Sequence, residues 1–194
     1  MAIRSLKTGV YSRSMLVGND YYIPPAFESI ATATGTSSSG TITFSSIPST
    51  FKHLQIRALI RTDEAGATET NCYLQVNGVT SSSYAYHWLR GNGTAAAAAG
   101  AATQTITFPA NATGASAAAS TMGVFIADIL DYGSTTKNKT FRYFSGYDLN
   151  GSGEVRVASG LFNLTNAITS IELKTSAGNW TTASSFALYG IKEA

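Results

Sequence analysis

Residues 52–61, KHLQIRALIR, alternate between polar and apolar side chains along most of their length. Successive side chains of a β-strand point to opposite faces, so this alternation indicates a strand with one buried face. Leu54, Ile56, Ala58 and Ile60 share one face, which we assign to a hydrophobic core. The opposite face carries His53, Gln55, Arg57 and Leu59. The two-residue period favours a strand over a helix and makes a β-sheet protein the first expectation.

The same period recurs on both sides of this segment, between turns rich in Gly, Asn and Ser. Further strands are predicted at residues 27–34, 41–47, 71–78, 82–93, 122–130, 139–148, 154–163, 167–175 and 184–192. About ten short strands with regular turn signals are typical of an all-β fold, and we expect a jelly-roll-like antiparallel β-sandwich over residues 26–194. Segment 122–130 is the most apolar, so we expect Ile126 and Ile129 to be buried together with Leu54 and Ile56.

Two connections carry signals of their own. Asn77-Gly78 ends a predicted strand, and this dipeptide favours a tight hairpin. Residues 94–121 are mostly small side chains, and we expect a long surface excursion there, as a connection between sheets. A short strand at 103–108 is the only regular element predicted within it.

Residues 1–25 do not follow the strand pattern. They carry no acidic residue before Asp20, and they end in Tyr-Tyr-Ile-Pro-Pro, whose prolines favour extended backbone. A segment with aromatic and cationic side chains but no core of its own is expected to become ordered on a partner. We therefore predict an extended N-terminal arm that anchors the protein or is exchanged between subunits, with a disordered tail as the alternative. The predicted anchoring residues are Arg4, Lys7, Tyr11, Arg13, Tyr21 and Tyr22.

The composition argues against several classes of partner. Thirteen basic and 11 acidic residues give a net charge of +2, which is too small for a nucleic-acid-binding surface. No apolar run is long enough for a membrane-spanning helix, and the N-terminus lacks the features of an export signal. Cys72 is the single cysteine and lies in a strand pattern, so we expect a small buried hydrophobe. We predict no nucleic-acid partner, no membrane partner and no cofactor.

The sequence offers little for catalysis. His53 and His87 are its two histidines, and no G-x-S-x-G motif accompanies them. Asp128 and Asp131 are three residues apart, so on a strand they point to opposite faces and cannot form a catalytic pair. We therefore expect a protein that is not an enzyme and has no catalytic residue.

Residues 148–154, DLNGSGE, are a weak candidate for a calcium site. Asp148, Asn150, Ser152 and Glu154 place oxygen ligands at alternate positions around a glycine turn. A tight hairpin without any ion is the alternative, because Asn-Gly with flanking Gly and Ser is itself a turn signal.

Aromatic side chains suggest a glycan-binding surface. Tyr84, Tyr86 and Trp88 fall on one face of the strand at 82–93, and we expect Trp180 to be exposed in GNWTT. Such rings stack on sugars, although aromatic residues at strand alternation more often pack in a core or an interface.

Several segments resemble, in this order, a set of small virion-associated proteins of tailed bacteriophages, of the type frequent in aquatic and cyanobacterial phages. The segments are 27–57, 77–93 (NGVTSSSYAYHWLRGNG), 125–142 (FIADILDYGSTTKNKTFR), 160–173 (GLFNLTNAITSIEL) and 184–192 (SSFALYGIK). The resemblance covers residues 20–192 except for the divergent stretch 94–121, and it carries no catalytic residue.

The resemblance implies a structural protein of a virion, assembled in the host bacterial cytoplasm. We expect a homotrimer anchored by its arm, with a tail- or neck-fibre type of role and host surface glycan as a candidate ligand. A capsid decoration (cement) protein is the alternative, and a carbohydrate-binding module is a further one. The expected partners are other virion proteins, namely a major capsid, neck or baseplate component.

Overall fold

The computed structural model describes residues 15–17, 20–22 and 26–192, and within them it contains strands and turns but no helix. The sandwich strands are β3 (Phe27–Thr34), β4 (Thr41–Phe44), β5 (His53–Ile60), β6 (Glu69–Val76), β7 (Tyr84–Gly91), β8 (Ala96–Gln104), β9 (Thr107–Thr113), β10 (Gly123–Ile129), β11 (Lys139–Asp148), β12 (Gly153–Phe162), β13 (Ile171–Thr175) and β14 (Ser185–Ile191). All ten strands predicted from the two-residue period are present, and the all-β prediction is confirmed.

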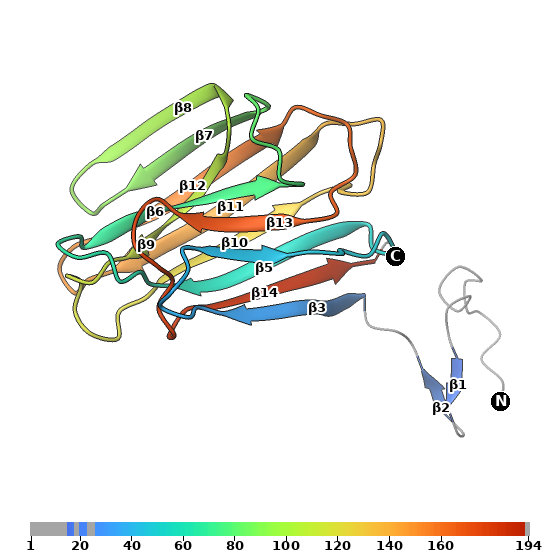
Figure 1. The fold of residues 1–194 in the computed structure, drawn as a ribbon, viewed down its shortest axis with the longest axis horizontal. Coiled ribbons are helices and arrows are strands. Elements are labelled where there is room, and N and C mark those ends of the chain that lie inside the picture. The colour runs from blue at the N-terminus through green and yellow to red at the C-terminus, as the bar shows by residue number, and fades with distance from the viewer. Residues whose placement is uncertain (1–14, 18–19, 23–25, 193–194) are drawn as a thin grey trace, which may run out of the picture.

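The strands form two antiparallel sheets that pack face to face (Figure 1). The large sheet has eight strands in the order β3-β14-β5-β10-β11-β12-β7-β8, and the small sheet has four in the order β4-β13-β6-β9. Strands β3 and β8 are the two edges of the large sheet (Figure 1).

The strand pairing follows jelly-roll topology. In a jelly roll of eight strands, the first strand pairs with the eighth, the second with the seventh, the third with the sixth and the fourth with the fifth. The pairs β4-β13, β5-β10, β6-β9 and β7-β8 reproduce this scheme. The hairpin β11-β12 is inserted between β10 and β7, and β14 and β3 extend the large sheet beyond β5. The fold is therefore a β-sandwich with a jelly-roll core and four additional strands.

The core lies between the inner faces of the two sheets. Phe125, Phe141 and Phe186 from the large sheet are buried together with Leu74 and Leu173 from the small sheet. Every second residue of β5 and β10 is buried, so the alternation in the sequence is the alternation of burial in the structure. Leu54, Ile56 and Ile129 are completely buried, as predicted.

The prediction for Ile126 is wrong. Its side chain is 38% exposed and lies on the outer face of the large sheet, opposite Phe144 of β11. Residues 126 and 129 are an odd number of positions apart, so they cannot share a face of one strand. Segment 123–129 is rich in apolar residues because both faces of β10 are apolar.

The alanine-rich region 94–121 is not the expected surface excursion. It contains β8, an exposed edge strand, and β9, in which all residues are buried. Small side chains let β9 pack close to the large sheet: a Cβ atom at Gly160 would lie 2.3 Å from Thr107 Oγ1. Pro109 is tolerated in β9 because this strand is an edge of the small sheet.

The hairpin predicted at Asn77-Gly78 is also wrong. Both residues have the positive φ angles that favour this dipeptide in turns, at 54° and 63°. However, β6 belongs to the small sheet and β7 to the large one, so the turn leads the chain from one sheet to the other.

In the N-terminal segment, β1 (Met15–Val17) and β2 (Asp20–Tyr22) pair with each other and with no strand of the sandwich (Figure 1). Of the predicted anchoring residues, Arg4, Lys7, Tyr11 and Arg13 lie outside the described residues, as do the side chains of Tyr21 and Tyr22. Among the described residues there is no helix of the length and apolarity needed to cross a membrane.

Ile129 and Ile126 provide a matched test of the register of β10. Ile129→Ala removes a completely buried side chain and should lower the free energy of unfolding by about 2–5 kcal/mol. Ile126→Ala truncates a partly exposed side chain on the same strand and should cost about 1 kcal/mol or less. Denaturant unfolding of both variants measures the difference, and equal losses would contradict the assignment of faces.

Candidate functional site: the outer face of the large sheet

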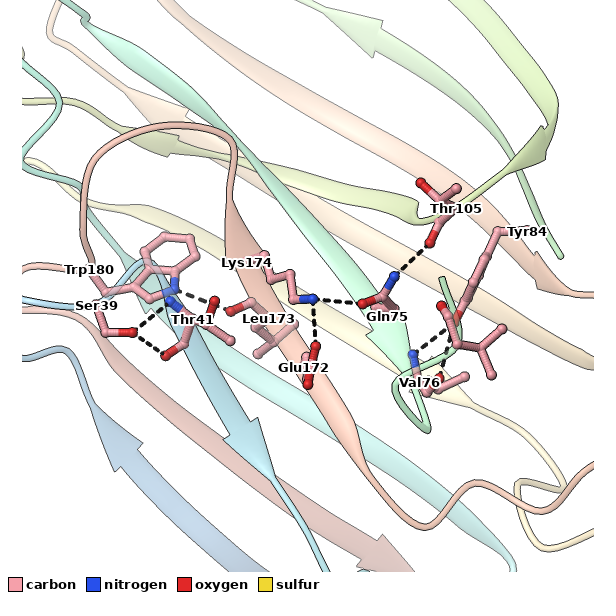
Figure 2. A network of polar contacts seen from close by, with 11 residues as sticks. Ser39, Thr41, Gln75, Val76, Tyr84, Thr105, Glu172, Leu173, Lys174 and Trp180 are labelled. Atoms are coloured by element: carbon pink, nitrogen blue, oxygen red, sulfur yellow. Dashed lines mark hydrogen bonds and ion pairs between the residues drawn. The ribbon is translucent and has the colours of Figure 1, made fainter. Parts of the chain in front are cut away.

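The two outer faces of the sandwich differ in polarity. On the small sheet, Lys174 Nζ lies 2.6 Å from Gln75 Oε1 and 2.6 Å from a carboxylate oxygen of Glu172 (Figure 2). Gln75 Nε2 in turn donates to the carbonyl oxygen of Thr105 at 2.9 Å (Figure 2). These side chains of the small sheet are polar and bind one another, and Gln75 among them is itself buried.

The outer face of the large sheet is apolar instead. Its large apolar side chains, which are 38–57% exposed, are Leu59, Leu89, Val124, Ile126, Phe144, Val155 and Val157, and we call them the apolar band. They lie in two adjacent rows across β5, β10, β11, β12 and β7. Cross-strand pairing places Phe144 beside both Ile126 and Val157, and places Val157 beside Leu89.

The size of the band indicates a contact surface. On a sheet face each residue occupies about 33 Å², so two rows over the five strands from β5 to β7 cover on the order of 330 Å². This lies within the range of roughly 300–600 Å² for the largest apolar patch of a monomer, which is often functional. It is less than half of the roughly 800 Å² that each partner buries in a standard interface. A stable contact must therefore also include neighbouring polar residues.

The adjacent row on the same face is polar. Asp128 Oδ1 accepts a hydrogen bond from Gln55 at 2.7 Å, and Arg142 Nη2 lies 2.6 Å from its Oδ2. Partial burial raises the pKa of Asp128, but the hydrogen bonds from Gln55 and Arg142 outweigh burial, so this pKa lies below its usual value. The Asp128 carboxylate is therefore ionised at neutral pH and already engaged within its own chain.

The apolar band is hollowed at two places. One open depression, of about 530 Å³, is lined by Leu59, Val124, Ile126 and Phe144 together with Arg57. A second, of about 570 Å³, lies over β12, β7 and β8 and includes Leu89 and Val157. The face is therefore indented at these two places and not flat.

A second polar cluster lies inside the sandwich. Arg156 and Glu154 are almost fully buried and form an ion pair at 2.7 Å, and Arg90 pairs with the other carboxylate oxygen at 2.7 Å. The guanidinium carbon of Arg156 lies 4.9 Å from the ring centre of Trp88 and 4.3 Å from that of Phe108. Burial lowers the pKa of Arg156, and the charge of Glu154 opposes this effect. The cluster stabilises the packing of β12 against β7 and β9.

The predicted glycan-binding set is wrong for two of its four residues. Tyr84 is buried, and its hydroxyl group accepts a hydrogen bond from the backbone nitrogen of Val76 at 3.0 Å (Figure 2). Trp180 is not exposed but completely buried, where its indole nitrogen donates to the carbonyl oxygen of Leu173 at 3.3 Å (Figure 2). Both rings are large apolar groups whose polar atoms are satisfied inside the core, so neither is available to a sugar.

The remaining two aromatic candidates are half-buried. Tyr86 packs edge-on against Phe108, with ring centres 6.1 Å apart. Trp88 is contacted by two guanidinium groups, those of Arg156 and of Arg90, the latter at 5.3 Å. Their rings already have partners within the protein and do not form a free stacking platform.

The calcium arrangement is not formed. Asp148 Oδ1 accepts a hydrogen bond from the backbone nitrogen of Asn150 at 2.7 Å, which closes the β11-β12 turn. Ser152 contributes its carbonyl oxygen to the same turn, through a hydrogen bond from Leu149. Glu154 points into the sandwich, toward Arg156, because it lies on the inner face of β12. The tight hairpin is therefore the correct interpretation, and no cluster of metal-ligating side chains occurs in the described part of the chain.

The histidines and aspartates are not brought together. His53 Nδ1 accepts a hydrogen bond from the backbone nitrogen of Asp131 at 3.0 Å, whereas His87 lies on the outer face of β7. Asp131 forms ion pairs with Lys137 and Lys52, and hydrogen bonds from these two lysines lower its pKa to about 2. Asp128 pairs with Arg142 instead, so the two carboxylates serve separate contacts. Asp131 follows β10 in a turn, so it does not lie on the strand on which the spacing argument placed it.

The apolar band was not predicted from the sequence. In β12 the charged residues Glu154 and Arg156 face inward, and Val155 and Val157 face outward. This arrangement is the opposite of the rule by which the strand faces were assigned, which places apolar side chains inward and polar side chains outward. The run Val124, Phe125, Ile126, apolar at successive positions, was the signal that both faces of β10 are covered by apolar side chains.

Comparisons with protein-family models, with curated proteins and with solved structures find no match to this chain.

The buried ion pair should be much more sensitive to substitution than an exposed one. Glu154→Gln leaves Arg156 without a counter-ion inside the sandwich and should cost about 3 kcal/mol of unfolding free energy. The same change at Glu172, whose pair with Lys174 is partly exposed, should cost less than about 1 kcal/mol. Denaturant midpoints give both values. Similar losses would mean that water reaches the Glu154 carboxylate in solution.

Proposed function

We propose that this chain is a non-enzymatic structural subunit of a tailed-bacteriophage virion, held in the particle through the outer face of its large sheet. The apolar band is the observation that carries the proposal, since exposed apolar patches of this size are often sites of contact with a partner. The resemblance of residues 20–192 to small virion-associated proteins supports the choice of particle.

Two positions in the particle are compatible with the proposal. A tail- or neck-fibre type of subunit is the first, and a capsid decoration protein is the second. The breadth of the band favours decoration, because such a protein lies against a shell with one face. Binding of host glycan is less well supported, because Tyr84 and Trp180 are part of the core. Copy number separates the two positions, since decoration proteins occur in far more copies than fibres.

Phe144→Asp tests whether the outer face holds the protein in the particle. Phe144 is 57% exposed, so the variant should fold with little change in thermal stability. Within an interface it buries an unpaired carboxylate, and its occupancy in purified virions should fall by roughly tenfold or more. Occupancy is measured by quantitative mass spectrometry of virions from cells that express the variant in place of the natural chain.

Thr43→Asp is the matched control. Thr43 is exposed on β4, on the outer face of the small sheet, so the same charge is placed on the opposite side of the sandwich. Its occupancy should equal that of the natural chain. If the natural chain is missing from purified virions, the proposed function is wrong.

The N-terminal arm is the second proposed attachment. Deleting residues 1–24 should leave a folded sandwich, because the strands from β3 onward pair only with one another. The same deletion should prevent incorporation, or dissolve the proposed homotrimer if arms are exchanged. Circular dichroism, sedimentation and occupancy in virions measure the three outcomes. Full occupancy of the truncated chain would refute the anchoring role.

A further inference from the structure

Arg57 borders the apolar band and is held in place without an acidic partner. Its Nε donates to Gln55 Oε1 at 2.9 Å. Its guanidinium carbon lies 5.4 Å from the ring centre of Phe27 and 5.9 Å from that of Tyr189. Within residues 26–192, neither terminal nitrogen of Arg57 has a hydrogen-bond acceptor or an ion-pair partner. Four N–H groups are therefore available to a ligand.

The surroundings prepare Arg57 for binding. Phe27 and Tyr189 are stacked with their ring centres 4.7 Å apart, and both rings contact the guanidinium group. Gln55 is in turn held by Asp128, through the hydrogen bond at 2.7 Å. A guanidinium group restricted in this way loses less conformational entropy when it binds, and its planar fork matches a carboxylate.

The depression of about 530 Å³ begins beside this guanidinium group. Its other walls include Leu59, Val124, Ile126 and Phe144, so a partner meets an apolar floor with one cation at its border. Desolvating Arg57 without an anion would be costly. The matching surface therefore combines apolar side chains with a carboxylate at one edge.

On the basis of the proposed structural role, we infer that this face binds a different protein of the particle, which places an Asp or Glu carboxylate on Arg57 and apolar side chains in the depression. The carboxylate and the guanidinium group fix the position of the partner, and the apolar band supplies most of the buried area.

A second copy of the chain is a poorer occupant. The carboxylate that its outer face presents beside the band is Asp128, and both oxygens of Asp128 are engaged by Gln55 and Arg142. Residues 1–19 are no better, because they carry three cationic residues and no acidic one. A second copy would bring to Arg57 an acid that is already paired, and residues 1–19 would bring a charge of the same sign.

The test uses two fluorescent peptides of equal length, one alternating Leu and Glu and the other alternating Leu and Lys. Fluorescence anisotropy measures their binding to the full chain. The Leu-Glu peptide should bind roughly tenfold more tightly than the Leu-Lys peptide, because only its carboxylates pair with Arg57. Arg57→Glu should reverse this order, and added salt should weaken the preference.

Two further variants serve as controls. Lys174→Glu makes the same reversal of charge on the small sheet and should leave the preference unchanged. Phe144→Ser removes an exposed ring from the depression and should weaken binding of the Leu-Glu peptide while the melting temperature stays close to that of the natural chain.

Three results would overturn the inference. The first is equal binding of both peptides, or a preference that Arg57→Glu leaves intact. The second is a dimer in sedimentation that Phe144→Ser dissolves, which would assign the face to a second copy. The third is Arg57-dependent binding to vesicles of phosphatidylglycerol and phosphatidylcholine without discrimination between the peptides, which would assign it to a lipid surface.

The inference and the proposed function fail separately. A chain found in virions that does not discriminate between the peptides retains its structural role and loses the carboxylate contact. A chain that discriminates but is missing from virions has the contact in another assembly.

Discussion

Eight strands pack against four in this sandwich, and this mismatch in width sets the environment of most side chains. Where the sheets overlap, Phe125, Phe141 and Phe186 are sealed between two apolar faces. At the margin near β7 the small sheet ends at β9, so the half-buried Trp88 is covered by arginine side chains instead of a strand. Within the described residues, no layer covers the outer face of the large sheet. The mismatch in width thus accounts for the core and for the margin.

In strand β12 the usual distribution of residues is reversed, with charged side chains on the inner face and apolar ones on the outer face. Its inner positions include Glu154 and Arg156, whose burial is offset by their ion pair and by the rings against which Arg156 packs. Its outer positions include Val155 and Val157, which gain less from folding than core valines do, since about half of each residue stays exposed. On this strand the buried Phe162 and the ion pair support the isolated sandwich more than the two outer valines do. Its valines become useful when another surface covers them.

The two-residue period correctly predicted the strands and the core residues of those strands in which polar and apolar side chains alternate. It located ten strands and placed Leu54 and Ile56 in the core, because β5 follows the rule of apolar inside and polar outside. Ile129 was placed in the core by the apolarity of its segment. The period failed where both faces of a strand carry side chains of the same type. Ile126 was assigned inward because nothing in an apolar run tells the two faces apart, and β9 was missed because small residues in a buried strand look like those of a loop. Trp180 was misplaced because its burial depends on Leu173 and Phe186, which belong to other strands.

The difference in polarity between the two outer faces supports the proposal that the band is a contact surface. Both faces belong to one sandwich in the same solvent, so a requirement of the fold alone would act on them alike. On the small sheet that requirement is met by Gln75, Glu172 and Lys174, which bind one another. On the large sheet the same role could be filled by polar side chains, yet large apolar ones occupy the central strands, at a cost in solubility. Arg57 adds direction to this surface, since its guanidinium group is held by two rings and, within the described residues, its terminal nitrogens have no hydrogen-bond acceptor. In the interface that we propose, the band and the cation form one half, and the other half is apolar and acidic.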